Sequence, residues 1–428
     1  MLKDVSLPLN LYIHDDTLLL YSPMQSSVPM HPSRWSFAGD TLKAFFKQQG
    51  IRLTLLYDAS ADNFSGTFSQ QLLRSQIVFG PADGLFVINR PQTPKPPFPY
   101  HEEEFVVSRR RAGVSLVGTL SLPEGDGPFP AVVLVSGSGQ QNRDEEIFGH
   151  KPFAVIADYL VRRGIAVARY DDRGVGGSTG DLSAATTLDF ADDAEAVFSY
   201  LRTHKHINPR QVGIIGHSEG AAIAALIASR NRKVAFAVML AGQGGTGADA
   251  LLQQNERFFR LQGVPDSLVS RRLAAYHELF DAIDTVADDD MASFVTTIFA
   301  RYSAGLTKDE CASIALGKYD AFLAAKQLSM PWMRTFLSLD MAPALAKLKC
   351  PLLALNGSND CQVLPSNLSV ISAATQGHAD TVLLDGLNHL FQNSTTGATD
   401  EYMLIDETFD MKALSIIHDW LRAVLKKE

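Results

Sequence analysis

The chain has 428 residues, 46% hydrophobic and 20% charged, which suits a folded protein of two domains or one large domain with insertions. Its net charge of −9 offers no basic field for a phosphate backbone, so we expect no nucleic-acid partner. Three cysteines form no disulfide framework or metal-binding pattern, and no apolar run approaches the roughly 18 residues of a membrane helix. We therefore expect no metal site and no membrane partner.

The first residues, MLKDVSLPLNLYIHDD, lack the apolar core of an export signal, because a short mixed run leads into two aspartates. The chain as written is expected to be cytoplasmic. A truncated or processed N-terminus would instead make it periplasmic or secreted.

Residues 1–90 predict a small β-rich domain. LNLYIHDDTLLLYSP and IRLTLLYDASADNFSGTFSQQ each indicate two strands around a polar turn. Five prolines between residues 91 and 99 favour an extended, semi-rigid linker over 91–101, because proline fixes φ and restricts the residue before it. HEEEFVVSRRRAGVSLVGTLSLPEG then predicts a β-hairpin, with its three arginines at 109–111 on a solvated strand edge.

From residue 130, short apolar runs alternate with amphipathic helices, which indicates a parallel α/β sheet. The predicted buried strands are Ala131–Ser136, Ile165–Tyr170, Val212–Gly216, Val234–Ala241, Leu352–Asn356 and Thr381–Leu384. Residues 247–345 hold several helical patterns and no strand-like run. They predict a helical insertion that would act as a lid or as a structural subdomain, within a catalytic domain of residues 102–246 and 346–428.

The segment GHSEG at 216–220 matches the G-x-S-x-G nucleophile elbow, in which a strand turns sharply into a helix and exposes a serine hydroxyl. An apolar strand, VGIIG, precedes Ser218, and a helix-forming run, AAIAALIAS, follows it. The small residues around the turn allow the helix to cross the strand closely. This context predicts that Ser218 is a nucleophile.

A serine nucleophile needs a base and an acid, which follow it in that fold as acid and then histidine. Asp360 lies in a loop after the strand LLALN, and His389 lies in a loop after the last predicted strand. Both follow the carboxyl ends of parallel strands, where open α/β sheets place their chemistry. We predict Asp360 as acid and His389 as base, with Asp385 as the alternative acid. His217 and His378 are alternative bases, and both are disfavoured. The geometry of the elbow points the His217 ring away from the serine, and His378 lies in a turn at the end of a helix, where it is expected at the surface.

The oxyanion of the transition state needs hydrogen-bond donors. One predicted donor is the backbone N–H of Glu219, the residue after the nucleophile. The other is the N–H of Ser138 or Gly139, in the glycine-containing loop SGSGQQNRDEE. The Glu219 carboxylate would oppose an oxyanion, so we expect it to turn aside and pair with Arg143 or Arg173.

The segment YDDRGVGGSTG, at 170–180, lacks the Lys-Ser/Thr pair of a phosphate-binding loop and is interpreted as a strand-to-helix turn near the active site. Together, SGSGQQNRDE, RYDDRGVGGSTG, GHSEG, LALNGSNDCQV and GLNHLFQ resemble a bacterial branch of the α/β-hydrolase superfamily. This branch comprises serine esterases of the Thermotoga type and is loosely related to serine aminopeptidases. The resemblance covers roughly residues 95–428 with five motifs in order.

The resemblance implies a carboxylic ester hydrolase that acts on small or medium acyl esters through an acyl-enzyme and needs no metal or organic cofactor. A peptidase or acyl-thioester hydrolase with the same triad is the alternative, since one scaffold hosts many substrates. Glu278, Asp281 and Asp284 are candidate anchors for a peptide amino terminus, or else a solvated helix face. A binding protein with an inactive hydrolase fold is disfavoured, because all three triad candidates are present. Five side chains are candidates for an acyl pocket or for the core: Phe258, Phe259, Trp332, Met333 and Phe336.

Overall fold

The structure is a computed structural model that describes residues 9–22, 29–70, 73–82 and 89–426. The chain divides into two compact units. The first comprises residues 1–91 together with 147–150, and the second comprises 92–146 and 151–428. Within the described ranges, no helix is both long and apolar enough to cross a membrane.

The first unit is built from antiparallel strands. A two-stranded hairpin pairs β1 with β2, and a five-stranded sheet has the order β3-β4-β5-β6-β7. The strand bounds are β1 Asn10–His14, β2 Thr17–Tyr21, β3 Arg34–Ala38, β4 Thr41–Phe46, β5 Ile51–Asp58, β6 Asn63–Gln70 and β7 Leu73–Phe79. Alternate residues of β5 are buried, as expected for a strand with one face on a core. Leu42, Phe46 and Leu53 belong to that core.

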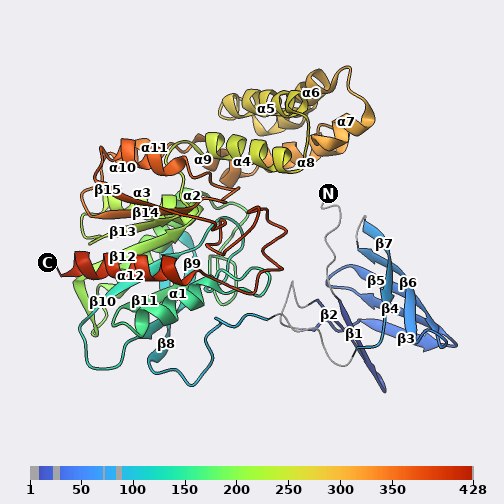
Figure 1. The fold of residues 1–428 in the computed structure, drawn as a ribbon, viewed down its shortest axis with the longest axis horizontal. Coiled ribbons are helices and arrows are strands. Elements are labelled where there is room, and N and C mark those ends of the chain that lie inside the picture. The colour runs from blue at the N-terminus through green and yellow to red at the C-terminus, as the bar shows by residue number, and fades with distance from the viewer. Residues whose placement is uncertain (1–8, 23–28, 71–72, 83–88, 427–428) are drawn as a thin grey trace. The chain divides into compact units, whose positions relative to one another are not determined.

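The second unit contains an eight-stranded sheet in the order β15-β14-β13-β12-β10-β11-β9-β8 (Figure 1). The hairpin β8–β9 is antiparallel, β9 runs antiparallel to β11, and the other neighbours are parallel. The strand bounds are β8 His101–Arg109, β9 Val114–Leu122, β10 Phe129–Val135, β11 Ala166–Tyr170, β12 Ile207–His217, β13 Ala237–Leu240, β14 Leu352–Gly357 and β15 Ala379–Leu384. A short 3₁₀ turn, Arg110–Ala112, joins β8 to β9.

Helices cover both faces of this sheet. Those outside the insertion are α1 Pro152–Val161, α2 Thr187–Leu201, α3 Glu219–Arg230, α10 Ala342–Leu345, α11 Asn367–Ala374 and α12 Met411–Leu425. Side chains of α2, α3, α10 and α11 share one apolar core with Val133 and Val135 of β10. Those of α1 and α12 share a second core with Val132 and Leu134. The strand thus buries alternate residues on opposite faces, which is why it consists of apolar residues throughout.

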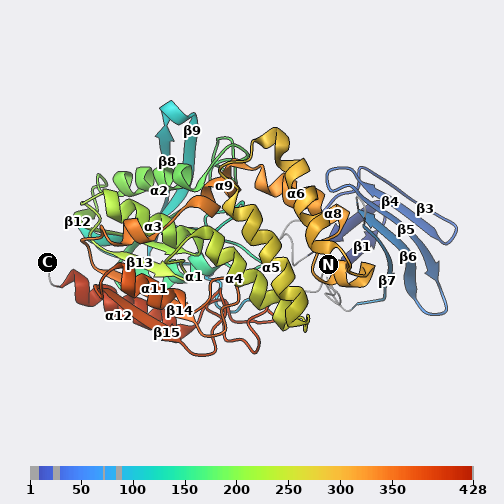
Figure 2. The ribbon, with the colours of Figure 1, turned by 90° about the horizontal axis from the view of Figure 1, so that it is seen from above.

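Between β13 and β14 lies a helical insertion (Figure 2, in yellow and orange). Its helices are α4 Gly247–Leu261, α5 Asp266–Asp281, α6 Asp288–Ser303, α7 Lys308–Ser313, α8 Lys318–Leu328 and α9 Pro331–Ser338. The insertion has an apolar core of its own, which includes Leu279, Val295 and Ile298. Its two ends meet at an antiparallel bridge between Thr246 and Asp340. It therefore enters and leaves the α/β domain at one place.

The proline-rich segment after the first unit contains no helix or strand over residues 91–100. The Gln92 side chain is nevertheless fixed: its amide nitrogen donates to the Phe409 carbonyl at 2.7 Å. Its amide oxygen accepts from the backbone of Thr408 at 2.6 Å and of Phe409 at 2.9 Å. The second unit therefore begins with a residue anchored to the loop before α12.

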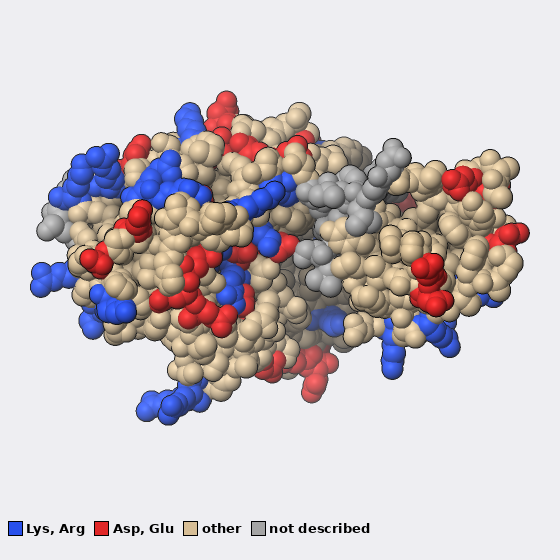
Figure 3. All heavy atoms as spheres, turned by 90° about the horizontal axis from the view of Figure 1, so that it is seen from below, with Lys and Arg blue, Asp and Glu red and all other residues tan. Residues whose placement is uncertain are grey.

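On the face drawn in Figure 3, acidic and basic side chains lie interspersed.

Candidate active site

Ser218 occupies the turn between β12 and α3 with φ 54° and ψ −119°, a conformation that is costly for a residue with a side chain. A Cβ atom at Gly216 would lie 1.9 Å from the carbonyl oxygen of Gly220. A Cβ atom at Gly220 would lie 2.1 Å from the carbonyl oxygen of Val135. The two glycines are therefore required for α3 to cross the strands closely enough to hold this turn.

His389 and Asp360 form a buried pair at the carboxyl end of the sheet. Nδ1 of His389 lies 2.9 Å from Oδ2 of Asp360. Oδ1 of Asp360 accepts hydrogen bonds from the backbone N–H groups of Gln362 at 2.8 Å and Val363 at 2.9 Å. A carboxylate held at Nδ1 orients the imidazole and leaves Nε2 as the nitrogen that can exchange a proton with a hydroxyl.

Neither Asp385, the alternative acid, nor His378, an alternative base, takes part in the pair of His389 and Asp360. Asp385 is exposed and accepts a hydrogen bond from the Ser358 hydroxyl at 3.2 Å. His378 is exposed in the turn after α11, where its Nδ1 lies 2.7 Å from the Thr375 carbonyl oxygen. The structure therefore places only Asp360, of the two candidate acids, against His389.

His217, the residue before Ser218, supports the backbone around the candidate site. Its Nδ1 lies 3.0 Å from Oε1 of Glu145, and its Nε2 lies 2.9 Å from the carbonyl oxygen of His389. Both partners accept hydrogen bonds, which favours the doubly protonated imidazolium form of the ring. Burial alone would lower the pKa of His217, but the Glu145 carboxylate, the His389 carbonyl and the charge of Asp360 together outweigh burial, and the pKa is raised.

This role of His217 does not follow from the sequence, which indicates only that the ring points away from the serine. The ring centroids of His217 and His389 lie 4.8 Å apart. Among the hydrogen bonds of the described residues, none joins the Ser218 hydroxyl to His389. Such contacts in unliganded hydrolases tighten on substrate binding.

The predicted oxyanion loop runs beside Ser218. A Cβ atom on Gly137 would lie 3.1 Å from the Ser218 Cβ atom, which places this backbone against the serine. The Gly137 N–H donates to Oε1 of Glu145 at 2.6 Å. Ser138 and Gly139 follow, and Gly139 has a φ of 111°, which favours glycine. The N–H of Glu219 belongs to the first turn of α3, where no acceptor exists within the helix.

The expected pairing of Glu219 with an arginine is wrong. Arg143 is bound by Asp171 at 2.8 Å, and Arg173 is bound by Asp193 at 2.6 Å, so closer carboxylates already occupy both arginines. Burial raises the pKa of Glu219, and hydrogen bonds from its polar neighbours oppose the rise.

Two side chains donate to Glu219 in place of an arginine. The Thr187 hydroxyl donates at 2.6 Å and Nε1 of Trp332 at 2.9 Å. The Ser138 side chain, together with these donors, acts to lower the pKa of Glu219 against the effect of burial. Trp332 is one of the aromatic residues considered for an acyl pocket, whereas Met333 from the same set lies in the core of the insertion.

A second buried carboxyl group, that of Asp172, holds the start of the predicted oxyanion loop. Oδ1 of Asp172 accepts from the Ser136 hydroxyl at 3.1 Å, and Oδ2 accepts from the Gln141 backbone at 3.2 Å. Burial raises the pKa of Asp172 to about 8. The turn after β11, identified from sequence only as a strand-to-helix connection, therefore supplies a structural support for the loop.

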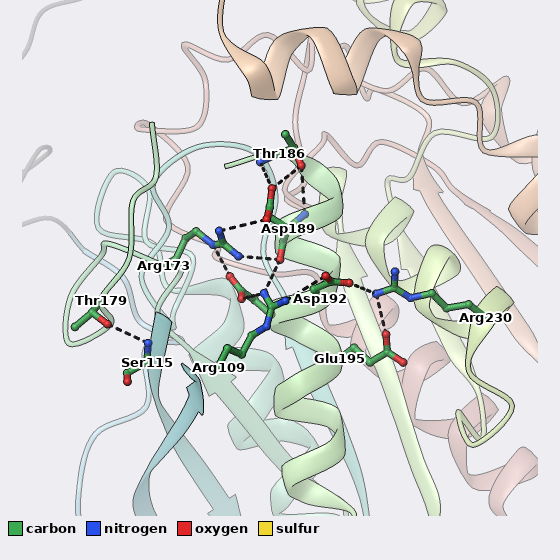
Figure 4. A network of polar contacts seen from close by, with 10 residues as sticks. Arg109, Ser115, Arg173, Thr179, Thr186, Asp189, Asp192, Glu195 and Arg230 are labelled. Carbon is green, nitrogen blue, oxygen red and sulfur yellow. Dashed lines mark hydrogen bonds and ion pairs between the residues drawn. The ribbon is translucent and has the colours of Figure 1, made fainter. Parts of the chain in front are cut away.

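Arg109, predicted on a solvated strand edge, is instead engaged by two carboxylates of α2 (Figure 4). It pairs with Asp192 at 3.1 Å and with Asp193, which also binds Arg173. Asp193 is 1% exposed, so burial of this acid draws the arginine inward. The end of β8 and the turn after β11 are thereby tied to the same helix.

The mostly parallel sheet, the strand–turn–helix at Ser218 and the order of serine, aspartate and histidine define an α/β hydrolase, and the predicted fold is confirmed. Residues 150–395 match the family described as serine aminopeptidase, S33. Because the match spans more than half of the chain, the chain belongs to this family and is a serine hydrolase.

The chain is similar to the esterase EstD of Thermotoga maritima, with 23% identity over 404 residues, covering 93% of this chain and 88% of that protein. Among solved structures it is similar to the Pyrococcus furiosus esterase Pf2001, with 15% identity, coverage of 76% of this chain and 93% of that one, and a TM-score of 0.45. The α/β hydrolase GrgF from Penicillium sp. sh18 has 15% identity, coverage of 77% and 99%, and a TM-score of 0.46.

Proposed function

We propose that the protein is a carboxylic ester hydrolase that acts on small or medium acyl esters through Ser218, His389 and Asp360. The observation that carries the proposal is the buried 2.9 Å hydrogen bond between Nδ1 of His389 and Oδ2 of Asp360. It provides an oriented base on the same edge of the sheet as the strained Ser218 turn. The esterase name of the T. maritima relative supports an ester as the substrate.

In the proposed reaction, Oγ of Ser218 attacks the ester carbonyl carbon while Nε2 of His389 takes the hydroxyl proton. The N–H groups of Glu219 and of Ser138 or Gly139 stabilise the resulting oxyanion. The intermediate collapses, the bond to the alkoxy oxygen breaks, and His389 returns the proton to the leaving alcohol. Water repeats the sequence on the acyl-enzyme and releases the acid. Asp360 keeps the imidazole oriented and stabilises its charged form.

An ester fits the insertion better than a peptide with a free amino terminus. The three acidic residues considered as amine anchors already have partners within or beside the insertion. Glu278 binds Arg301 at 2.7 Å, Asp281 binds His277 at 2.8 Å, and Asp284 accepts from Ser338 at 2.8 Å. An ammonium group would have to displace these contacts. We propose that the insertion is a lid, since its Trp332 contacts the residue after the nucleophile.

The test compares hydrolysis of p-nitrophenyl acetate, butyrate and octanoate, and of an aminoacyl-p-nitroanilide, by the wild type and by Ser218→Ala. We expect the wild type to cleave the shorter esters and S218A to lose at least about 10⁴-fold in kcat. Ser229→Ala is the matched control, because Ser229 lies in α3 and its hydroxyl only binds the Leu226 carbonyl. Cleavage of the anilide alone would replace the esterase by a peptidase. An S218A variant as active as the wild type would refute the mechanism.

A further inference from the structure

The Glu219 carboxylate lies between two separate elements of the second unit. It is only 4% exposed, and its donors come from the start of α2 and from α9 of the insertion. A buried carboxylate is costly unless hydrogen bonds compensate it, and it can only accept them. Donors from separate elements therefore gain energy together only while those elements keep their relative positions.

Trp332 connects this carboxylate to the insertion. Its Nε1 lies 2.9 Å and 3.1 Å from the two oxygens of Glu219. Its ring is stacked on that of Phe336 one turn later in α9, with centroids 5.5 Å apart. Met333 and Leu337 of the same helix belong to the core of the insertion. The indole is thus held by packing, and its N–H fixes which way the Glu219 side chain points.

The backbone of Glu219 connects the same residue to the reaction. Its N–H lies in the first turn of α3, directly after Ser218, and is a proposed oxyanion donor. The loop after β10 is held separately, because the Gly137 N–H donates to Glu145 at 2.6 Å. A shift of the Glu219 side chain would therefore turn the first peptide of α3 without releasing that loop. Such donors act only when correctly aimed at the oxyanion.

We propose that Glu219 and Trp332 are positioning residues that hold the Glu219 N–H at the start of α3 and make the geometry of this oxyanion donor depend on the helical insertion. This inference rests on the proposed function of the same site. Because an oxyanion donor acts on the transition state, a misplaced donor lowers kcat and leaves KM for a short ester nearly unchanged.

The experiment measures kcat and KM for p-nitrophenyl acetate in Trp332→Phe, Glu219→Gln and the double variant. W332F keeps the stacked ring and removes the donor, and E219Q keeps the shape and removes the charge. Trp420→Phe is the matched control, because Nε1 of Trp420 donates to Asp380 at 2.7 Å in the same kind of hydrogen bond, but on α12. We expect kcat to fall about 10- to 100-fold in W332F and in E219Q, with the double variant no worse than the poorer single variant.

A second readout is the rate at which a fluorophosphonate labels Ser218, because the phosphoryl oxygen needs the same donors as the ester oxyanion. We expect this rate to fall in parallel with kcat while the melting temperature of W332F stays within a few degrees of the W420F value. Unchanged kcat and labelling in both W332F and E219Q would overturn the inference, and so would additive losses. Failure of the proposed function is distinct: the wild type would then not cleave esters, yet labelling would still test the role of Glu219 and Trp332.

Discussion

Asp172 shows how burial of a single residue changes its chemistry. The residue is 8% exposed, and burial raises its pKa from 3.8 to about 8, against the opposing effect of its hydrogen bonds with Gln141 and Ser136. The charges of Glu145 and Glu219 raise it further. Between these two pKa values the unfolded chain has lost the proton and the folded chain retains it. The contribution of protonated Asp172 to the free energy of unfolding is therefore complete at low pH and is lost as pH rises towards 8.

Asp172→Asn should remove this dependence. As pH rises from about 5 to about 8, the free energy of unfolding of the wild type should fall relative to that of D172N by up to about 1.4 kcal/mol per pH unit. Urea unfolding of both proteins across this range measures the difference. Asp181→Asn is the control, because Asp181 is exposed and its pKa is lowered by hydrogen bonds with Ser183. Parallel curves for wild type and D172N would show that Asp172 titrates normally.

At the scale of elements, α2 is held by charges at its first two turns (Figure 4). Asp193 receives Arg173 at 2.6 Å and also binds Arg109. Asp192, its neighbour in sequence, faces outward and binds Arg230 at 2.6 Å. The same helix begins with Thr187, which donates to Glu219. Charges that fix α2 therefore also fix one support of the candidate active site.

Asp193→Asn should destabilise the protein by about 3 kcal/mol, because it leaves two inward-facing guanidinium groups without their shared carboxylate. Asp192→Asn should cost less than about 1 kcal/mol, since its side chain is 47% exposed and its ion pairs are screened by water. Chemical denaturation of the two variants gives the comparison. Equal losses would mean that burial does not distinguish the two acids.

For the whole molecule, the two units have separate apolar cores. The core of the first unit lies within residues 18–55, with partly buried neighbours up to Phe79. The cores of the second unit begin at Phe105 and end at Leu421. Separate cores indicate separate cooperative unfolding.

Leu53→Ala tests this separation, since Leu53 is 1% exposed in the core of the first unit. Loss of its side chain should cost about 2 to 5 kcal/mol and lower one calorimetric transition, leaving kcat/KM for esters within about twofold of the wild type. Ile214→Ala, on the strand that leads to Ser218, should lower the other transition and the activity. A matching loss of activity in L53A would show that the first unit contributes to the site.

Much of this organisation could be predicted from the sequence, because its signals are local. Buried parallel strands appear as apolar runs, and the turn at Ser218 requires Gly216 and Gly220 within five residues. The supports of the site are different. Glu145 and His217 are 72 residues apart, and Glu219 and Trp332 are 113 apart. Nothing in a local pattern pairs such residues. The sequence suggests an arginine as the partner of Glu219, whereas in the structure nearer acids hold both arginines.

The narrow attachment of the insertion has an evolutionary consequence. Because its two ends meet at the bridge between Thr246 and Asp340, the whole segment can be exchanged for another without moving a strand of the sheet. Because the insertion has an apolar core of its own, a replacement segment with its own core could fold independently of the sheet. A lineage of such enzymes could thus acquire new substrates by swapping this segment. Each replacement segment would still have to present a hydrogen-bond donor to Glu219, as Trp332 does in this protein.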